Sequence, residues 1–193
     1  MSAPGAHHAH GHELPTSGRA LDGVALSATL HCLTGCAIGE IAGMVVGTAL
    51  GWGNGATIAI SVALAFVFGY SLTSLPLLRA GLTLAAVAPI AFASDTLSIA
   101  VMEVVDNVIV LAVPGALDAG VGDVLFWGSL AFALAVAGAA AFPVNRWLIA
   151  RGRGHAAVHR TGIHGGPRPA VVGGVAAAAF VFGTVVLVAK LLG

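Results

Sequence analysis

The chain has 193 residues, of which 58% are hydrophobic and only 8% are charged, and its formal net charge at neutral pH is zero. This composition excludes a soluble enzyme with one apolar helix and is typical of a polytopic membrane protein. It leaves no basic, aromatic-rich surface, so no nucleic-acid partner is expected. The expected fold class is an all-α, polytopic transmembrane helix bundle in contact with membrane lipid.

Residues 1–20 are expected to form a flexible, His-rich cytoplasmic tail. The segment lacks the basic region, short apolar core and small-residue cleavage site of a secretory signal. Neutral imidazoles in such a tract can collect copper, zinc or nickel, although a low-complexity tail without a ligand would have the same composition. The auxiliary metal-capturing histidines predicted here are His7, His8, His10 and His12.

Residues 21–193 are expected to form a single transmembrane helical domain. A helix needs about 20 apolar residues to cross a bilayer, which predicts about five spans. They lie near 23–50, 56–78, 93–114, 123–147 and 170–192. The stretch 82–93 contains Pro89 and could be a short re-entrant or interfacial helix, and the sequence leaves open whether it spans the membrane.

Basic residues in the short connections predict the orientation. Arg19, Arg79 and the arginines between the fourth and fifth spans fall on one side of a five-span chain. We therefore expect a multi-pass protein of the bacterial inner membrane with a cytoplasmic N-terminus. The basic link also carries His155 and His159, which could pair on one helical turn as auxiliary metal ligands, while the link as a whole could contact anionic lipid headgroups.

The first span has two ridges, each with a four-residue repeat. One consists of small residues and predicts close approach of another helix backbone; its members are Gly35, Gly39, Gly43, Gly47 and Gly51. The neighbouring ridge carries Cys32, Cys36, Glu40 and Met44, and His31 adjoins it. Because residues four apart are neighbours on a helix surface, these ligand types line up along the span. The alternative interpretation is inert thiols, a packed methionine and a structural carboxyl group.

The third span carries three carboxylates, and no basic residue lies between positions 80 and 145. On a helix, Asp95, Met102 and Asp106 fall on one line, with Glu103 and Asn107 on an adjoining one. Carboxylates in a membrane span have to be protonated, hydrated or close to a cation, so they are candidates for a proton or ion path. Asp95 could instead cap the start of the helix.

Several familiar motifs are missing from the sequence. It contains no Gly-rich phosphate loop, no CxxC pair, no HExxH helix and no CxxCH motif. We therefore expect neither a nucleotide nor a haem, and a role other than catalysis is favoured over an enzymatic one.

Three strings of the sequence resemble a bacterial integral-membrane family that is defined as a domain of unknown function. They read "HCLTGCAIGEIAGMVVGTALGW", "DTLSIAVMEVVDN" and "FPVNRWLIARGRGHA", and the resemblance covers about residues 25–160. It implies a multi-span helical protein of the bacterial inner membrane and assigns no role to any residue. The positions that it marks are His31, Cys32, Cys36, Glu40, Asp95, Glu103, Asp106, Asn107 and Asn145.

The chemistry of these residues predicts a protein that binds and transports a transition-metal cation, with copper first and zinc or nickel next. Sulfur and imidazole ligands select such cations over magnesium or calcium. The predicted metal ligands are His31, Cys32, Cys36, Glu40, Met44, Met102, Glu103 and Asp106, with His31, Cys32 and Cys36 forming a first site. The predicted proton or ion path consists of Glu40, Asp95, Glu103 and Asp106.

Two other classes of function stay open. The first is a membrane scaffold or assembly subunit, in which the glycine ridge of the first span docks a partner membrane helix. The second is a membrane metalloenzyme or redox protein that keeps a fixed ion. A homo-oligomer or a partner helix is a further expectation, because a chain of this size would often need one to enclose a polar path.

Overall fold

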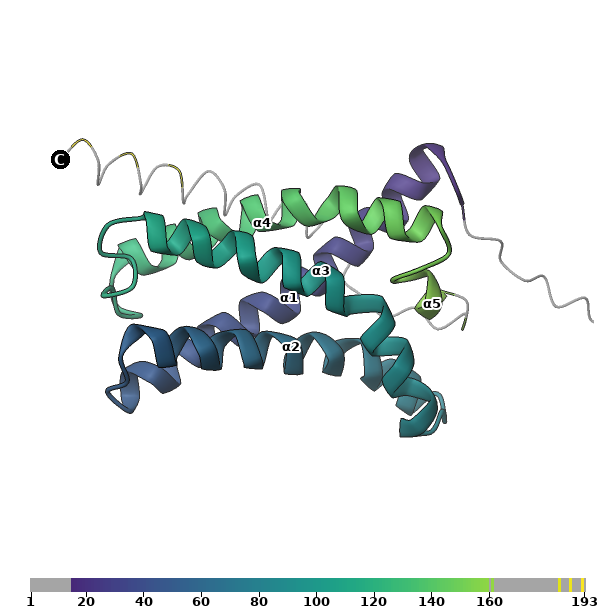
Figure 1. The fold of residues 1–193 in the computed structure, drawn as a ribbon, viewed down its shortest axis with the longest axis horizontal. Helices are drawn as coiled ribbons and strands as arrows, with labels where there is room; N and C mark the ends of the chain where they lie inside the picture. Colours follow the sequence, from purple (N-terminus) through teal and green to yellow (C-terminus); the bar gives the residue numbers. More distant parts are fainter. Residues whose placement is uncertain (1–14, 160, 162–183, 185–187, 189–191, 193) are drawn as a thin grey trace, which may run out of the picture.

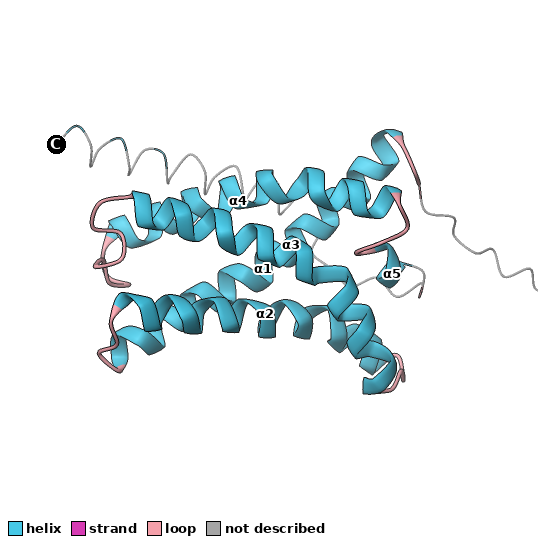
Figure 2. Ribbon diagram, in the orientation of Figure 1, coloured by secondary structure: helices cyan, strands magenta, loops and turns pink. Residues whose placement is uncertain are grey.

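The fold was obtained as a computed structural model that describes residues 15–159, 161, 184, 188 and 192. Figures 1 and 2 show a bundle of long helices, and the described residues contain no strand. The elements are α1 (Gly18–Ala49), α2 (Asn54–Arg79), α3 (Leu84–Ala112), α4 (Val124–Ala150) and the short α5 (Ala156–His159).

Four of these helices, α1 to α4, are long and apolar enough to cross a membrane. The predicted all-α, multi-pass membrane fold is therefore confirmed. The predicted fifth span, 170–192, lies outside the described residues except at three isolated positions, and the His-rich residues 7–12 lie outside them entirely. Successive long helices alternate in direction, so α1 and α3 run the same way and place their N-termini at the same end of the bundle.

The stretch 82–93 is not a separate short helix. Residues from Leu84 onward belong to α3, which continues without a break to Ala112 and has Pro89 inside it. A proline in a helix removes one backbone hydrogen bond and bends the axis, but it does not have to end the helix. In Figure 1 α3 changes direction near its start and then runs beside α4. The correction matters for Asp95, which lies inside α3 and does not cap its N-terminus.

The glycine ridge of α1 packs directly against α2. Each glycine lies against a small residue of the antiparallel helix, and successive contacts are four residues apart on both helices. The pairs are Gly35 with Gly69, Gly39 with Ala65, Gly43 with Ser61 and Gly47 with Thr57. This is the close backbone approach that small residues allow in membrane helices. Gly51, the last member of the predicted ridge, lies beyond the end of α1.

The same four-residue step brings His31 of α1 opposite Thr73 of α2. Their side chains form a hydrogen bond between His31 Nε2 and Thr73 Oγ1 with a length of 2.8 Å. The small-residue interface therefore ends in a polar contact near one end of the bundle. We call this end the basic end, because Arg79 ends α2 here and Arg151 follows α4.

A glycine-containing turn after α4 folds the chain back toward the bundle. Gly152 and Gly154 have positive φ angles of 66° and 59°, a conformation that side chains other than glycine rarely adopt. The amide of Arg153 donates to the carbonyl of Leu148, which helps to close the C-terminus of α4 in the manner of a glycine cap. His155 follows this turn and is buried, although it belongs to the connection after α4.

Candidate functional site

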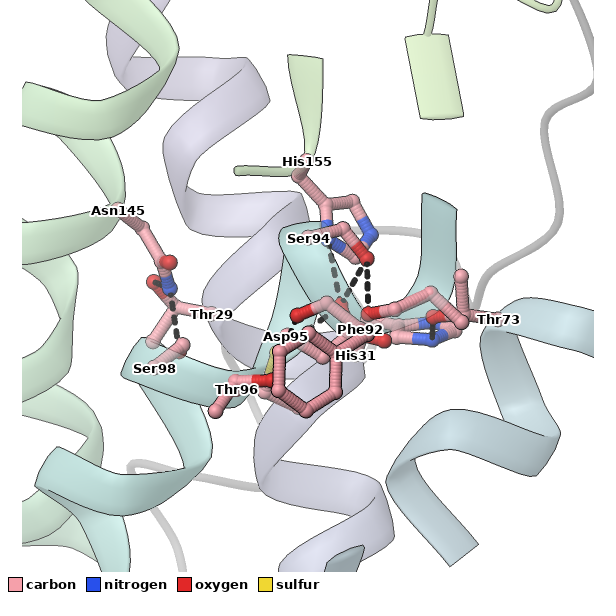
Figure 3. Close-up of polar contacts among 12 residues, drawn as sticks. Thr29, His31, Thr73, Phe92, Ser94, Asp95, Thr96, Ser98, Asn145 and His155 are labelled. Atoms are coloured by element: carbon pink, nitrogen blue, oxygen red, sulfur yellow. Dashed lines mark hydrogen bonds and ion pairs between the residues drawn. The ribbon is translucent and has the colours of Figure 1, made fainter. Parts of the chain in front are cut away.

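Three buried side chains from separate segments converge near the basic end. They are Cys32 of α1, Asp95 of α3 and His155 of the turn after α4, and we call them the His155 cluster. His155 Nδ1 lies 3.1 Å from Asp95 Oδ1, and Cys32 Sγ lies 3.9 Å from the same oxygen. One nitrogen, one oxygen and one sulfur atom thus lie within 4.8 Å of one another. Figure 3 shows His155 reaching toward Asp95 from outside the helices.

Neighbouring polar groups hold the carboxylate and the imidazole in place. Ser94 Oγ donates a 2.7 Å hydrogen bond to Asp95 Oδ1, so this oxygen is surrounded by donors. Asp95 Oδ2 is buried and has no hydrogen-bond partner among the described residues. The ring of His31 meets the ring of His155 edge to face, with 5.1 Å between the centroids. The ring of His31 therefore packs against the ring of His155, and Thr73 forms a hydrogen bond with the Nε2 atom of His31.

Asn145 of α4 joins the two helices that supply the cluster. Its Nδ2 atom donates 2.9 Å hydrogen bonds to Thr29 Oγ1 of α1 and to Ser98 Oγ of α3. All three side chains are buried, and the branched contact is visible in Figure 3. Ser98 lies one turn after Asp95 on α3, and Thr29 lies one turn before Cys32 on α1. Asn145 therefore links α1 and α3 beside the His155 cluster.

The donor set of the His155 cluster fits a borderline divalent metal ion. In a tetrahedral zinc site, bonds of about 2.3 Å to sulfur and about 2.0 Å to nitrogen or oxygen put ligand atoms roughly 3.3–3.6 Å apart. The separations of 3.1 Å between nitrogen and oxygen and 3.9 Å between sulfur and oxygen lie on either side of this range. The unpartnered Asp95 Oδ2 adds a free acceptor at the same place. With three protein ligands, such a site would keep a fourth position for water or for an incoming ligand.

One helical turn further from the basic end, the second cysteine has different neighbours. Cys36 Sγ lies 3.9 Å from Met102 Sδ of α3, and Glu103 is a neighbour of the Cys36 side chain. The predicted cysteine pair is therefore divided between two places. Cys32 faces Asp95 and His155, whereas Cys36 faces Met102 and Glu103.

Three carboxyl groups meet deeper in the bundle, and we call them the carboxylate cluster. Glu40 of α1 is a neighbour of both Glu103 and Asp106 of α3. Their exposed fractions are only 6%, 5% and 2%. Both side-chain oxygens of Glu103, both of Asp106 and one of Glu40 have no hydrogen-bond donor among the described residues. The cluster thus contains buried carboxyl oxygens that no hydrogen-bond donor among the described residues satisfies.

Two separate cavities lie between Glu40 and the end of the bundle opposite the basic end. A cavity of about 20 Å³ is lined by Glu40, Met44 and Asn107, among others. A larger cavity of about 290 Å³ is lined by Met44 and by loop residues that include Asp118. Met44 and Leu117 line both cavities. The predicted ligand Met44 thus lies beside these cavities and not among the contacts of the two cysteines.

The structure rearranges the site that the sequence predicts. His31, Cys32 and Cys36 do not form one ligand set, because Cys36 points to Met102 and the His31 Nε2 atom is bonded to Thr73. His155, predicted only as an auxiliary ligand, occupies the central position beside Asp95. Its predicted partnership with His159 is not described, because the side chain of His159 lies outside the described residues.

Sequence reasoning missed the hydroxyl groups that surround the site, among them Thr73, Ser94 and Ser98. A usable signal was present in α2, where small and hydroxyl residues recur every four positions and mirror the glycines of α1: Thr57, Ser61, Ala65, Gly69 and Thr73. Aligning the two repeats in antiparallel directions places Thr73 opposite His31. Such an alignment finds this contact without a structure.

Comparison with known proteins identifies one family. The model of a family described as domain of unknown function 4396 matches residues 23–154, which include most of α1 and all of α2, α3 and α4, and end one residue before His155. No curated protein and no solved structure matches the chain significantly. The matched range exceeds half of the chain and contains Cys32, Asp95 and the carboxylate cluster. The chain belongs to the family defined by domain of unknown function 4396.

Proposed function

We propose that this protein is a cation transporter of the bacterial inner membrane that binds a borderline transition-metal ion at the His155 cluster. The observation that carries the proposal is the convergence of thiol, carboxylate and imidazole groups within 4.8 Å inside an apolar bundle. Polar groups inside a membrane bundle are expensive and mark ion paths. A mixed sulfur, nitrogen and oxygen donor set suits zinc, copper(II) or nickel better than magnesium or calcium.

The composition of the site shifts the expected ion from copper toward zinc. The sequence suggested copper first because the thiols of Cys32 and Cys36 and the imidazole of His31 lie on one predicted span, and sulfur and imidazole ligands select a soft or borderline ion. The His155 cluster instead combines a single thiol with a hard carboxylate, and the second thiol faces Met102. Soft copper(I) prefers sulfur ligands, whereas zinc accepts cysteine, histidine and aspartate in one tetrahedral site.

Transport, as opposed to storage, is supported by the polar line that continues from the His155 cluster. Cys36, Met102 and the carboxylate cluster follow it along α1 and α3. Cys32 and Met44 are twelve residues apart, which corresponds to roughly 18 Å along a helix axis. Past Met44, the larger cavity begins. We place the basic end in the cytoplasm, because arginines gather there.

The scaffold alternative has lost its main support. It depended on a free glycine ridge that could dock a partner helix. Gly35, Gly39, Gly43 and Gly47 are all covered by α2 of the same chain. No particular observation in the described residues favours the metalloenzyme alternative.

The first experiment compares two equivalent substitutions in the full-length protein, purified in detergent. Cys32→Ser and Cys36→Ser make the same change on the same helix, one turn apart. Both are made in a chain whose tail histidines are replaced by serine, so that the tail does not contribute to metal binding. Zinc affinity is measured by competition with a chromophoric chelator, and cobalt(II) reports thiolate ligation through its charge-transfer absorption.

Cys32→Ser is expected to weaken zinc binding at least ~10-fold, a difference of about 1.4 kcal/mol, and to remove the cobalt–thiolate band. Cys36→Ser should keep the band and stay within about 2-fold of the parent protein, a free-energy difference of about 0.4 kcal/mol. Equal affinities for the two variants would contradict the proposed site. Zinc movement into sealed proteoliposomes, lost in Cys32→Ser and kept in Cys36→Ser, would then separate transport from storage.

A further inference from the structure

A large apolar groove between α1 and α4 has no part in the proposed function. Its volume is about 780 Å³, which lies within the range of small-molecule binding sites. Apart from Asp22 and Thr29, the residues that line it are apolar. Figure 1 shows the first turns of α1 beside the last turns of α4, where Leu21 and Ile149 share a small core. The groove therefore opens on the outside of the bundle, near the basic end.

The groove extends from the basic end to about the middle of the bundle. Asp22 and Leu33, the outermost residues that line it on α1, are eleven residues apart, which corresponds to about 16 Å along a helix axis. The hydrocarbon core of a bilayer is about 30 Å thick, so one leaflet is about 15 Å deep. The groove thus has the depth of a single leaflet. A helix that crosses the whole bilayer would need a groove about twice as deep.

The inside of the groove suits a hydrocarbon chain. Leu26 on its wall is 38% exposed, whereas Leu30 in its floor is only 5% exposed. A Cβ atom added to Gly23 at the mouth would meet no atom within 4 Å, so the mouth is wide. Thr29 Oγ1 donates to a carbonyl of its own helix and accepts from Asn145, which leaves it little capacity to bind a polar ligand. Recognition inside the groove is therefore apolar.

A pair of opposite charges stands at the mouth of the groove. Arg146 lies one turn beyond Phe142 of the lining, and its Nε atom donates to Asp22 Oδ1 at 2.7 Å. Both side chains are nearly half exposed. The contact uses Nε and Oδ1, so the terminal N–H groups of Arg146 and the Oδ2 atom of Asp22 have no hydrogen bond to a described residue. Guanidinium N–H groups bind phosphate, and a carboxylate oxygen accepts from an ammonium group.

Trp147 marks the level of the membrane surface beside this pair. Its side chain is 49% exposed, and the guanidinium carbon of Arg151 lies 4.2 Å from the centroid of its ring. Tryptophan is enriched at the boundary between the hydrocarbon core and the lipid headgroups. Arg146 is the preceding residue of α4, so it lies at nearly the same depth. The charge pair is therefore at headgroup level, and the groove lies below it in the hydrocarbon.

We propose that the groove binds one phospholipid from the leaflet at the basic end, with a headgroup that carries a phosphate and a primary ammonium group, as in phosphatidylethanolamine. The phosphate accepts from the guanidinium of Arg146, the ammonium group donates to Asp22, and an acyl chain fills the groove. Each charge of the headgroup meets an opposite charge of the protein. The inference does not depend on the proposed transport function, because no residue of the groove belongs to the His155 cluster or the carboxylate cluster.

The first test measures lipid binding to the full-length protein, delipidated in detergent, by native mass spectrometry. The probes are dioleoyl phosphatidylethanolamine, phosphatidylcholine and phosphatidylglycerol, which have the same acyl chains. The quaternary ammonium of phosphatidylcholine cannot donate a hydrogen bond, and phosphatidylglycerol has no cation. Phosphatidylethanolamine should bind at least ~5-fold more tightly than either, and Asp22→Asn should abolish its advantage over phosphatidylcholine. Equal affinities of the parent protein for all three lipids would overturn the inference.

Two substitutions with matched controls locate the bound lipid. Arg146→Gln removes the cation at the mouth and Leu26→Trp fills the groove, and each should weaken phosphatidylethanolamine binding at least ~5-fold. The controls on α2 are Arg79→Gln at its end and Leu75→Trp at a position that is 45% exposed; both should stay within ~2-fold of the parent protein. Circular dichroism confirms that each variant keeps its helices. A groove variant that binds the lipid as tightly as its control would contradict the inference.

Photo-cross-linking in proteoliposomes identifies what occupies the groove. The probe is phosphatidylethanolamine with a photoreactive diazirine in its acyl chain, and the modified peptides are identified by mass spectrometry. Adducts should concentrate on 22–33 and 135–142 and be less frequent around Leu75 of α2. Equal labelling of these faces would show that the groove selects no lipid. A groove without adducts would show that it is covered by residues 170–192 or by a second copy of the chain, and the inference would be wrong.

Discussion

The two polar clusters use the same pair of parallel helices but differ in the partners that surround them. In the His155 cluster, Asp95 accepts from Ser94 and contacts His155, and His31 is held by Thr73. In the carboxylate cluster, Glu103 and Asp106 have no donor among the described residues. In the first arrangement one oxygen of Asp95 has a hydroxyl donor and an imidazole beside it, whereas both oxygens of Glu103 and of Asp106 in the second arrangement have no donor, which is costly for a buried polar group.

The difference arises from what each neighbouring segment supplies at that depth. Near the basic end, α2 provides Thr73, α4 provides Asn145 and the following turn provides His155. Deeper in the bundle, the same helices provide small or hydroxyl residues that bond to backbone carbonyls. The hydrogen-bond partners of a polar side chain on α1 or α3 are therefore set by the segments packed around it.

The largest effect should come from loosening the support that both clusters share. Gly39→Ala would place a Cβ against the backbone of Ala65 and force α1 away from α2. Overpacking of this kind should lower the free energy of unfolding by about 3 kcal/mol, measured by denaturation in mixed detergent micelles. Gly55→Ala is the matched control, because a Cβ there meets open space. Equal stabilities of the two variants would show that close packing on α2 is unimportant.

A pair of identical substitutions tests the contrast between the clusters directly, in protein from which metal has been removed. Asp95→Asn weakens the contacts to Ser94 and His155 and should destabilise the fold by about 2 kcal/mol, the range for hydrogen bonds to charged groups. Asp106→Asn replaces a carboxyl group that has no hydrogen-bond donor among the described residues by an amide of similar shape, and it should change stability by less than ~0.5 kcal/mol. Thermal unfolding followed by circular dichroism distinguishes them. A larger loss for Asp106→Asn would reverse the comparison.

A smaller effect is expected from Asn145→Ala, which removes the bridge beside the His155 cluster. Two interhelical hydrogen bonds are lost, to Thr29 and to Ser98, and such bonds contribute about 0.6 kcal/mol each in membrane proteins. We expect a loss of about 1 to 1.5 kcal/mol together with weaker zinc binding. The control, Asn107→Ala, removes an amide whose hydrogen bond among the described residues is to Glu103 O of its own helix. Zinc affinity unchanged by Asn145→Ala would show that the bridge does not position the cluster.

The smallest effect should come from a polar pair that belongs to neither cluster. Arg146 Nε and Asp22 Oδ1 are 2.7 Å apart, but both side chains are nearly half exposed. Asp22→Asn should cost at most ~0.5 kcal/mol, as exposed ion pairs do, and the difference should shrink when salt is raised. Unfolding measured at two salt concentrations checks this. A loss as large as that of Asp95→Asn would mean that burial is not what distinguishes the clusters.

The sequence by itself determined the class of the protein and the local order of its ligands. Apolar runs long enough for a bilayer predict the spans, and the four-residue repeat of α1 predicts one face of glycine and another of Cys32, Cys36 and Glu40. These inferences are reliable because helical periodicity is a property of neighbouring residues. They also place Glu103 and Asp106 on adjoining lines of one helix.

Only the tertiary structure decided which ligands share a site. His155 reaches Asp95 because two glycines with positive φ angles turn the chain back after α4. The spacing of residues along the sequence does not predict this contact. Cys32 and Cys36 have different neighbours because α1 and α3 are packed so that successive turns meet Asp95 and then Met102. Contacts across helices depend on how their axes cross, which is set by side-chain packing along the whole interface.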